Sequence, residues 1–198
     1  MKGLLLHDWY QIKKYCRVMG LLAVFFLVLY VASPQPFCLI YPCMLMSMLP
    51  ITLLSYDEKT GWQRYCKNFP LKKGQYVSEK YLTGLLAALA VTLVGLLLLG
   101  VQYLRGHLPI EEAQALGLSM IAMELLSPAL TLPFVFRFGA EKGRMAYYLV
   151  IGGGGAAVML FMGGSLQPSL PVALLCLGAI VLYALSWILS KKLYEKRE

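Results

Sequence analysis

The chain has 198 residues, of which 59% are hydrophobic and 14% charged, and its formal net charge at pH 7 is +8. A water-soluble domain of this length needs many more polar residues to cover its surface, so this composition excludes a soluble globular protein. The positive charge requires no nucleic-acid partner, because the lysines and arginines cluster beside long apolar runs, where they set membrane topology.

Residues 1–17 are predicted to form an amphipathic helix that lies in the membrane interface. Leu5, Trp9 and Ile12 fall on one face at helical spacing, while polar and basic side chains fall on the other. The segment lacks the apolar core and the cleavage site of a signal peptide. Two roles are open: an anchor that leads into the first span, and an elbow helix that transmits movement between cytoplasm and membrane.

Four runs with almost no charged residues predict six transmembrane helices, because one span needs about 20 apolar residues. The runs cover residues 18–56, 81–104, 113–136 and 145–190. Turns containing proline, at residues 33–36 and 163–169, divide the two longest runs. We therefore expect residues 18–198 to form one all-α membrane domain, with spans near 17–33, 37–54, 81–104, 113–136, 145–162 and 170–190.

The orientation follows from the distribution of lysine and arginine. Of the 18 lysines and arginines, all but Arg105 lie in residues 2–17, 59–80, 137–144 and 191–197, which this topology places on one side of the membrane. The side with the basic residues is cytoplasmic by the positive-inside rule. We therefore expect both termini in the cytoplasm.

Two segments, 55–80 and 137–144, are predicted to be cytoplasmic loops. In the first, Trp62, Tyr65, Cys66 and Phe69 recur at the spacing of a short amphipathic helix, which Pro70 would end. The aromatic side chains would either rest on lipid headgroups or dock onto a soluble partner. The pattern alone leaves both interpretations open.

Glu124 is the one ionisable residue expected at membrane depth. Such a residue is costly to bury in lipid, so it faces either other protein groups or a wet cavity. One interpretation is a protonated carboxyl that hydrogen-bonds to a neighbouring helix. The other is a position in a substrate pathway.

No recognised catalytic or cofactor-binding motif is present in the sequence. The metalloprotease and hydrolase motifs HExxH and GxSxG do not occur, and the glycines at residues 152–155 are not followed by the lysine of a P-loop. The five cysteines form no CxxC pair and no cluster with histidine, so a metal site is not expected. We predict a protein that is not itself an enzyme and that carries no cofactor.

Segments at three places resemble small type-2 ABC export permeases. The first cytoplasmic loop carries the resemblance in residues 54–62, 69–73 and 78–82, and the second loop in residues 136–144. The opening residues 1–8 are also similar, with His7-Asp8 where the family often has a Lys-Asp pair. The similarity extends over essentially the whole chain, in the same order and spacing, and includes permeases of bacterial peptide-toxin exporters.

The resemblance implies a multi-pass permease in a bacterial cell membrane, with ATP and magnesium bound by a separate ABC ATPase subunit. Two permease chains would form the path for an amphipathic or hydrophobic substrate, with a peptide as the leading candidate. A homodimer is the simplest assembly, and a heterodimer with a second permease is also compatible. Residues 56–69 would form the coupling helix. The positions expected to couple to the ATPase are Asp57, Glu58, Trp62, Tyr65, Phe69, Phe138, Glu141, Lys142 and Arg144.

Two other classes of function remain open at this stage. One is a membrane anchor or assembly factor that recruits a cytosolic protein without transporting anything. The other is a secondary transporter, which would normally have more spans and a polar site at the midplane. The sequence also departs from larger permeases, because only a short polar turn at residues 163–169 separates the last two spans and leaves no room for re-entrant helices.

Overall fold

The computed structural model describes residues 2–66, 73–162 and 169–195, and every regular element in these ranges is an α-helix. For the described residues the predicted all-α class is confirmed. The helices are α1 (Lys2–Tyr15), α2 (Arg17–Ala32), α3 (Pro36–Ser47), α4 (Leu49–Thr60), α5 (Trp62–Cys66), α6 (Lys73–Leu104), α7 (Ile110–Phe138), α8 (Ala140–Met162) and α9 (Ser169–Glu195).

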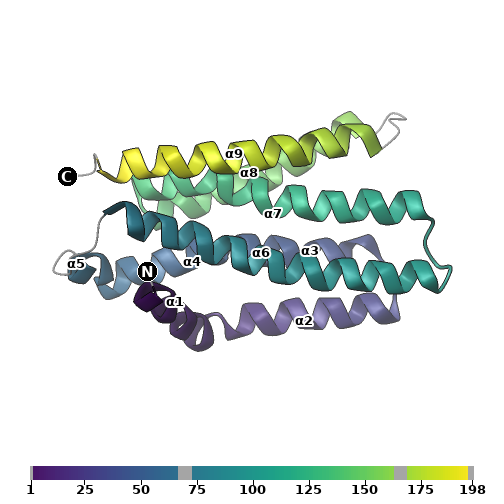
Figure 1. The fold of residues 1–198 in the computed structure, drawn as a ribbon, viewed down its shortest axis with the longest axis horizontal. Coiled ribbons are helices and arrows are strands. Elements are labelled where there is room, and N and C mark those ends of the chain that lie inside the picture. Colours follow the sequence, from purple (N-terminus) through teal and green to yellow (C-terminus); the bar gives the residue numbers. More distant parts are fainter. Residues whose placement is uncertain (1, 67–72, 163–168, 196–198) are drawn as a thin grey trace.

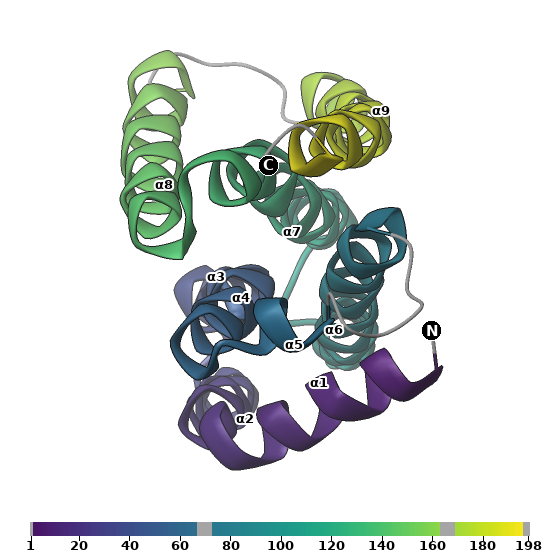
Figure 2. The same ribbon diagram turned by 90° about the vertical axis from the view of Figure 1, so that its left-hand side faces the viewer.

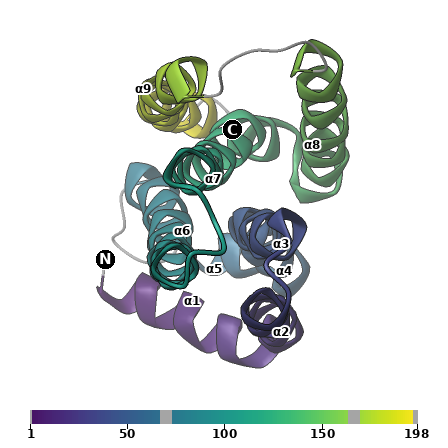
Figure 3. The same cartoon turned by 90° about the vertical axis from the view of Figure 1, so that its right-hand side faces the viewer.

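The long helices run side by side along one axis, and the short α5 lies at one end of the bundle (Figure 1). At that end α1 lies across the bundle, passing from α2 to α6 (Figure 2). Helix α7 is central, since it packs against α3, α6, α8 and α9. Seen from the opposite end, α8 and α9 flank α7 (Figure 3). We call the end that carries α1 and α5 the α5 end.

Four helices in the described part of the chain are long and apolar enough to cross a membrane: Pro36–Thr60, Gly74–Leu104, Ile110–Phe138 and Cys176–Tyr194. A fifth is counted only if α1 and α2, which meet at an angle of 72°, form a single broken span. The six predicted spans are therefore confirmed only in part. Of the turn predicted at residues 163–169, all but Ser169 lies outside the described residues, and Ser169 is the first residue of α9.

The two predicted cytoplasmic loops are almost entirely helical where the structure describes them. Gly61 has φ +70° and ends α4, and α5 begins at the next residue. Gly139 has φ +93° and is the single residue between α7 and α8. Glycine adopts positive φ without the steric cost that a side chain brings, so both residues allow a sharp change of direction. The second loop, predicted over 137–144, is thus a one-residue junction.

Two main groups of buried apolar residues hold the bundle together. The group at the α5 end includes Ile51, Val77, Leu132 and Phe136, which come from α4, α6 and α7. The group toward the other end includes Leu39 and Met120, among others. Many large apolar side chains on the outward faces of α2, α6 and α9 are exposed. Such a surface is expected where lipid rather than water surrounds the helices.

Candidate functional site

Four charged side chains meet in the protein interior at the α5 end. They are Asp8 of α1, Asp57 of α4 and the neighbours Glu79 and Lys80 of α6, and each is at most 2% exposed. We call these four residues the charge cluster. Lys80 Nζ lies 2.5 Å from Asp8 Oδ1 and 2.8 Å from Asp57 Oδ2. One ammonium group therefore ties three helices together.

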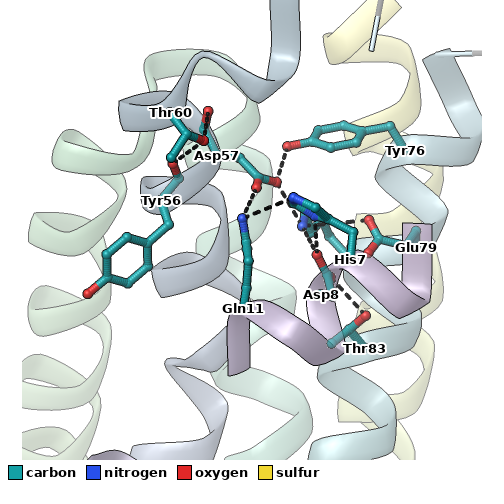
Figure 4. Close-up of polar contacts among 10 residues, drawn as sticks. His7, Asp8, Gln11, Tyr56, Asp57, Thr60, Tyr76, Glu79 and Thr83 are labelled. Carbon is teal, nitrogen blue, oxygen red and sulfur yellow. Dashed lines mark hydrogen bonds and ion pairs between the residues drawn. The ribbon is translucent and has the colours of Figure 1, made fainter. Parts of the chain in front are cut away.

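Neutral side chains complete the hydrogen bonds of the two aspartates (Figure 4). Asp57 accepts hydrogen bonds of 2.8 Å from Gln11 Nε2 and from the Tyr76 hydroxyl. Asp8 accepts a hydrogen bond of 3.1 Å from the Thr83 hydroxyl. A buried charge is costly unless it is paired and hydrogen-bonded, and both aspartates meet that condition.

The charge on Asp8 follows from its surroundings. Burial alone would raise the pKa of this carboxyl, but contact with His7 and the positive charge of Lys80 together hold it below its usual range. Asp8 is therefore ionised at neutral pH and forms a true ion pair with Lys80.

The carboxyl group of Glu79 lies farther from Lys80 Nζ than those of the two aspartates. Its carboxyl oxygens are buried and have no hydrogen-bond partner among the described residues, and its nearer oxygen lies 3.7 Å from Lys80 Nζ. The cluster thus combines three carboxyl groups with one lysine. Because Lys80 is the cation that both aspartates contact, this arrangement is sensitive to any loss of the lysine.

Helical spacing on two helices brings these groups together. Leu4, Asp8 and Gln11 occupy one face of α1, and all three are buried. Tyr76, Lys80 and Thr83 have the same spacing on α6. The buried face of α1 differs from the apolar face of the sequence prediction, because Trp9 is 54% exposed while Gln11 is buried. Gln11 lies inward because Asp57 supplies its acceptor.

A ring stack joins α1 to the predicted coupling helix. The rings of His7 and Trp62 are stacked with their centroids 4.0 Å apart. Trp62, at the start of α5, is half-buried, whereas Tyr65 on the same helix is 66% exposed. Phe69, also predicted for this helix, lies outside the described residues. Within α5, Tyr65 therefore presents an aromatic surface to the exterior, and Trp62 contacts the rest of the protein.

The other predicted coupling residues lie around the junction of α7 and α8. The half-buried Glu58 accepts a 3.0 Å hydrogen bond from the backbone N–H of Ala140, at the first turn of α8, where a carboxylate also matches the helix dipole. Phe138, Glu141 and Lys142 are exposed, and Arg144 is half-buried. Glu58 thus connects the two segments that the sequence predicted as separate loops.

Asp57 has a different position from the one expected of a residue that touches a partner. Its side chain is 0% exposed and is fully engaged by Gln11, Tyr76 and Lys80. Any effect of Asp57 on a partner must therefore pass through the charge cluster.

Glu124 lies inside the protomer, between helices α6 and α7. It is 1% exposed, and one carboxyl oxygen accepts a hydrogen bond from the Thr92 hydroxyl of α6. The other oxygen has no partner among the described residues. This position matches the first of the two interpretations above, a hydrogen bond to a neighbouring helix. A role of Glu124 in a substrate pathway stays a prediction.

Sequence reasoning missed the part played by Gln11, Tyr76, Glu79 and Lys80. Lys80 served as a topology signal, and Glu79 and Lys80 were part of a segment that resembles the family, but neither was predicted to lie in a buried cluster. The sequence did contain a signal for a buried ion pair, since charged residues border apolar runs in three separate segments. Residues 1–8, 54–62 and 78–82, which carried the resemblance, are the segments that meet in the charge cluster.

The fold and this site define a helical membrane protein with a cluster of paired charges buried at its α5 end. A family model described as ABC-2 family transporter protein matches residues 3–195 of the chain. The chain therefore belongs to the ABC-2 transporter family, whose members are multi-pass membrane components that work with an ABC ATPase. A comparison with curated proteins found no match.

Proposed function

We propose that this chain is the permease subunit of an ATP-driven exporter and that α5 is the helix on which the ATPase subunit acts. The observation that carries the proposal is the link from α5 into the membrane helices. Trp62 contacts His7 of α1, and Asp8 and Gln11 on the same helix connect to α6 and α4. A push on α5 would therefore reach three helices at once.

A surface hollow beside α5 suits a docked partner. It has a volume of about 420 Å³ and lies between α1 and the α4–α5 turn. Its lining combines aromatic and polar side chains, and it consists of His7, Tyr10, Gln11, Lys14, Tyr15, Thr60, Trp62 and Tyr65. Aromatic side chains with polar neighbours are typical of the centre of protein interfaces. We assign this hollow and the exposed Tyr65 to contact with the ATPase.

The rest of the proposal follows the family. Two copies of the chain would form the export path, ATP would be hydrolysed in the partner, and both termini would lie in the cytoplasm with the α5 end. The proposed cargo is an amphipathic or hydrophobic molecule, in the first place a peptide, because the described helix faces offer mainly apolar side chains. A simple membrane anchor would need no buried link between its docking helix and its membrane helices.

Site-specific photo-crosslinking of the full chain in its native membrane tests the docking site. A photo-reactive phenylalanine analogue at Tyr65 should crosslink to a protein with nucleotide-binding motifs, identified by mass spectrometry. The matched control is the same analogue at Tyr103, which is 46% exposed but lies near the far end of α6. Capture of no nucleotide-binding protein at Tyr65, or equal capture at both positions, would refute the proposed docking site.

A further inference from the structure

A mainly apolar groove runs between α7 and α9 on the outside of the bundle. Its volume is about 530 Å³. Its walls include Phe134, Leu185 and Leu189, each at least half exposed. The hydroxyl of Ser186, the one uncharged polar side chain in the lining, is engaged by Tyr81 of α6. The groove therefore offers hydrocarbon contact along its length.

Two cations stand at one end of this groove. Arg137, in the last turn of α7, and Lys192, in the last turn of α9, both line the cavity and are both exposed. The Arg137 guanidinium lies 5.2 Å from the centroid of the Phe138 ring, which holds it beside the groove. Among the described residues, no acidic side chain lines the cavity. The groove thus has an apolar body and a cationic mouth.

The length of the groove matches one leaflet of a bilayer. Between Leu182 and Lys192 the rise of an α-helix gives about 15 Å, which is half of a hydrocarbon core of about 30 Å. The mouth lies at the α5 end, where the basic residues gather. In the proposed orientation the groove therefore faces the inner leaflet, with Arg137 and Lys192 at the depth of the headgroups.

We propose that this groove binds an anionic phospholipid of the inner leaflet. The lipid phosphate would lie between Arg137 and Lys192, and an acyl chain would follow the seam between α7 and α9. Charge complementarity favours this occupant, because an anionic lipid has its negative charge at one end and hydrocarbon along the rest, as the groove requires. The proposal rests on the proposed orientation of the chain and not on the identity of the cargo.

Lipid-dependent stability of the purified full chain in detergent tests the site. Dioleoyl phosphatidylglycerol should raise the thermal unfolding temperature in a saturable way, and phosphatidylcholine with the same chains should not. The double variant Arg137→Gln, Lys192→Gln should bind phosphatidylglycerol about tenfold or more weakly, since each basic side chain near an anionic lipid contributes about fivefold. The conservative exchange Arg137→Lys, Lys192→Arg should restore binding, which also guards against misfolding of the neutral pair.

The matched control is Lys13→Gln with Lys59→Gln, which removes the same charge from exposed positions outside the groove. The control should bind phosphatidylglycerol as the native chain does. An equal loss in the control, or equal stabilisation by phosphatidylcholine, would overturn the proposal. Stabilisation by glycerophosphoglycerol alone would show a free phosphate site instead. A disulfide formed between two copies of a Leu189→Cys variant would show that a second chain fills the groove, and would also overturn it.

Discussion

The imidazole of His7 lies almost parallel to the indole of Trp62, with an angle of 7° between the ring planes. This stack joins α1 to α5, the proposed coupling helix, and the next residue along α1 is Asp8, which is paired with Lys80. Helix α1 thus contacts α5 with one residue and α6 with the next. Of the two roles left open for this helix, the contacts favour the elbow that transmits movement.

We predict that Trp62→Ala weakens ATPase association by about tenfold, because a few aromatic residues usually dominate an interface. His7→Ala should weaken association less than Trp62→Ala does but should also reduce the stimulation of ATPase activity, because the His7 ring stacks on Trp62 and links it to α1. Co-purification and ATPase assays on the reconstituted complex would measure both. Trp9→Ala is the control, since Trp9 is exposed but does not line the hollow beside α5. Equal losses in Trp9→Ala and Trp62→Ala would contradict the assignment.

We predict a large loss of stability for one substitution in the charge cluster and almost none for its neighbour. Lys80→Gln should lower the free energy of unfolding by about 3–5 kcal/mol, because it leaves buried carboxylates without their cation. Glu79→Gln should be close to neutral, because it keeps the size of the side chain and leaves the contacts of Lys80 with both aspartates in place. Denaturant unfolding in detergent would compare the two. A loss with Glu79→Gln as large as with Lys80→Gln would show that our account of the cluster is wrong.

Because Asp57 is buried, a substitution that reverses its charge tests the stability of the fold and not a surface contact. Asp57→Lys would place a second buried ammonium beside Lys80, so we expect it to prevent stable folding. Asp57→Asn keeps the shape and part of the hydrogen bonding, and we expect a chain that inserts normally but is less stable. Detergent-extracted yield and thermal unfolding distinguish the two. A stable Asp57→Lys chain would mean that Asp57 reaches the surface in the assembled protein.

Glu124→Gln should leave stability and export almost unchanged, because an amide can still accept the hydrogen bond from Thr92. Glu124→Leu loses this bond and should cost about 1 kcal/mol. Export of cationic and neutral peptides from proteoliposomes with the ATPase bound, measured beside thermal stability, tests both variants. A selective loss of cationic export in Glu124→Gln would support the pathway role instead.

Close packing of α7 on α8 provides a test with a glycine control. A Cβ atom on Gly143 would stand 2.2 Å from Cγ2 of Val135, whereas a Cβ on Gly152 would meet nothing within 4 Å. Gly143→Ala should therefore destabilise the protein by about 1–3 kcal/mol, and Gly152→Ala should be neutral or slightly stabilising. Thermal unfolding of the two variants side by side gives the comparison. Equal effects would mean that α7 and α8 pack less closely at Gly143 than the structure shows.

Cysteine labelling in intact cells tests the orientation, starting from a chain whose five cysteines are replaced. Single cysteines at Gln35 and His107 should react with an impermeant reagent from outside. Cysteines at Thr60 and Lys142 should react only after the membrane is opened. All four residues are exposed in the structure, so a lack of labelling reports sidedness and not burial. External labelling at Thr60 would reverse the topology and remove the basis of the coupling proposal.

The sequence by itself determined the class of the protein and the position of some of its turns. Long runs without charge can only be buried in lipid or protein, so composition and spacing were sufficient to predict an all-α membrane protein. The proline turn predicted at residues 33–36 lies where α2 ends, at Ala32, and α3 begins, at Pro36. These features depend on residues that are neighbours in the chain, and a linear pattern can report them.

Only the tertiary structure decided which helix faces meet. Asp57 looked like a surface residue of a loop, and Gln11 like part of a polar face, yet both are buried against each other because α1 lies across α4 and α6. Glu124 likewise accepts a hydrogen bond from Thr92 on α6, which is 32 positions away in the chain. A carboxylate is stable inside a protein only if donors from other helices reach it, and the packing of distant segments alone determines whether they do.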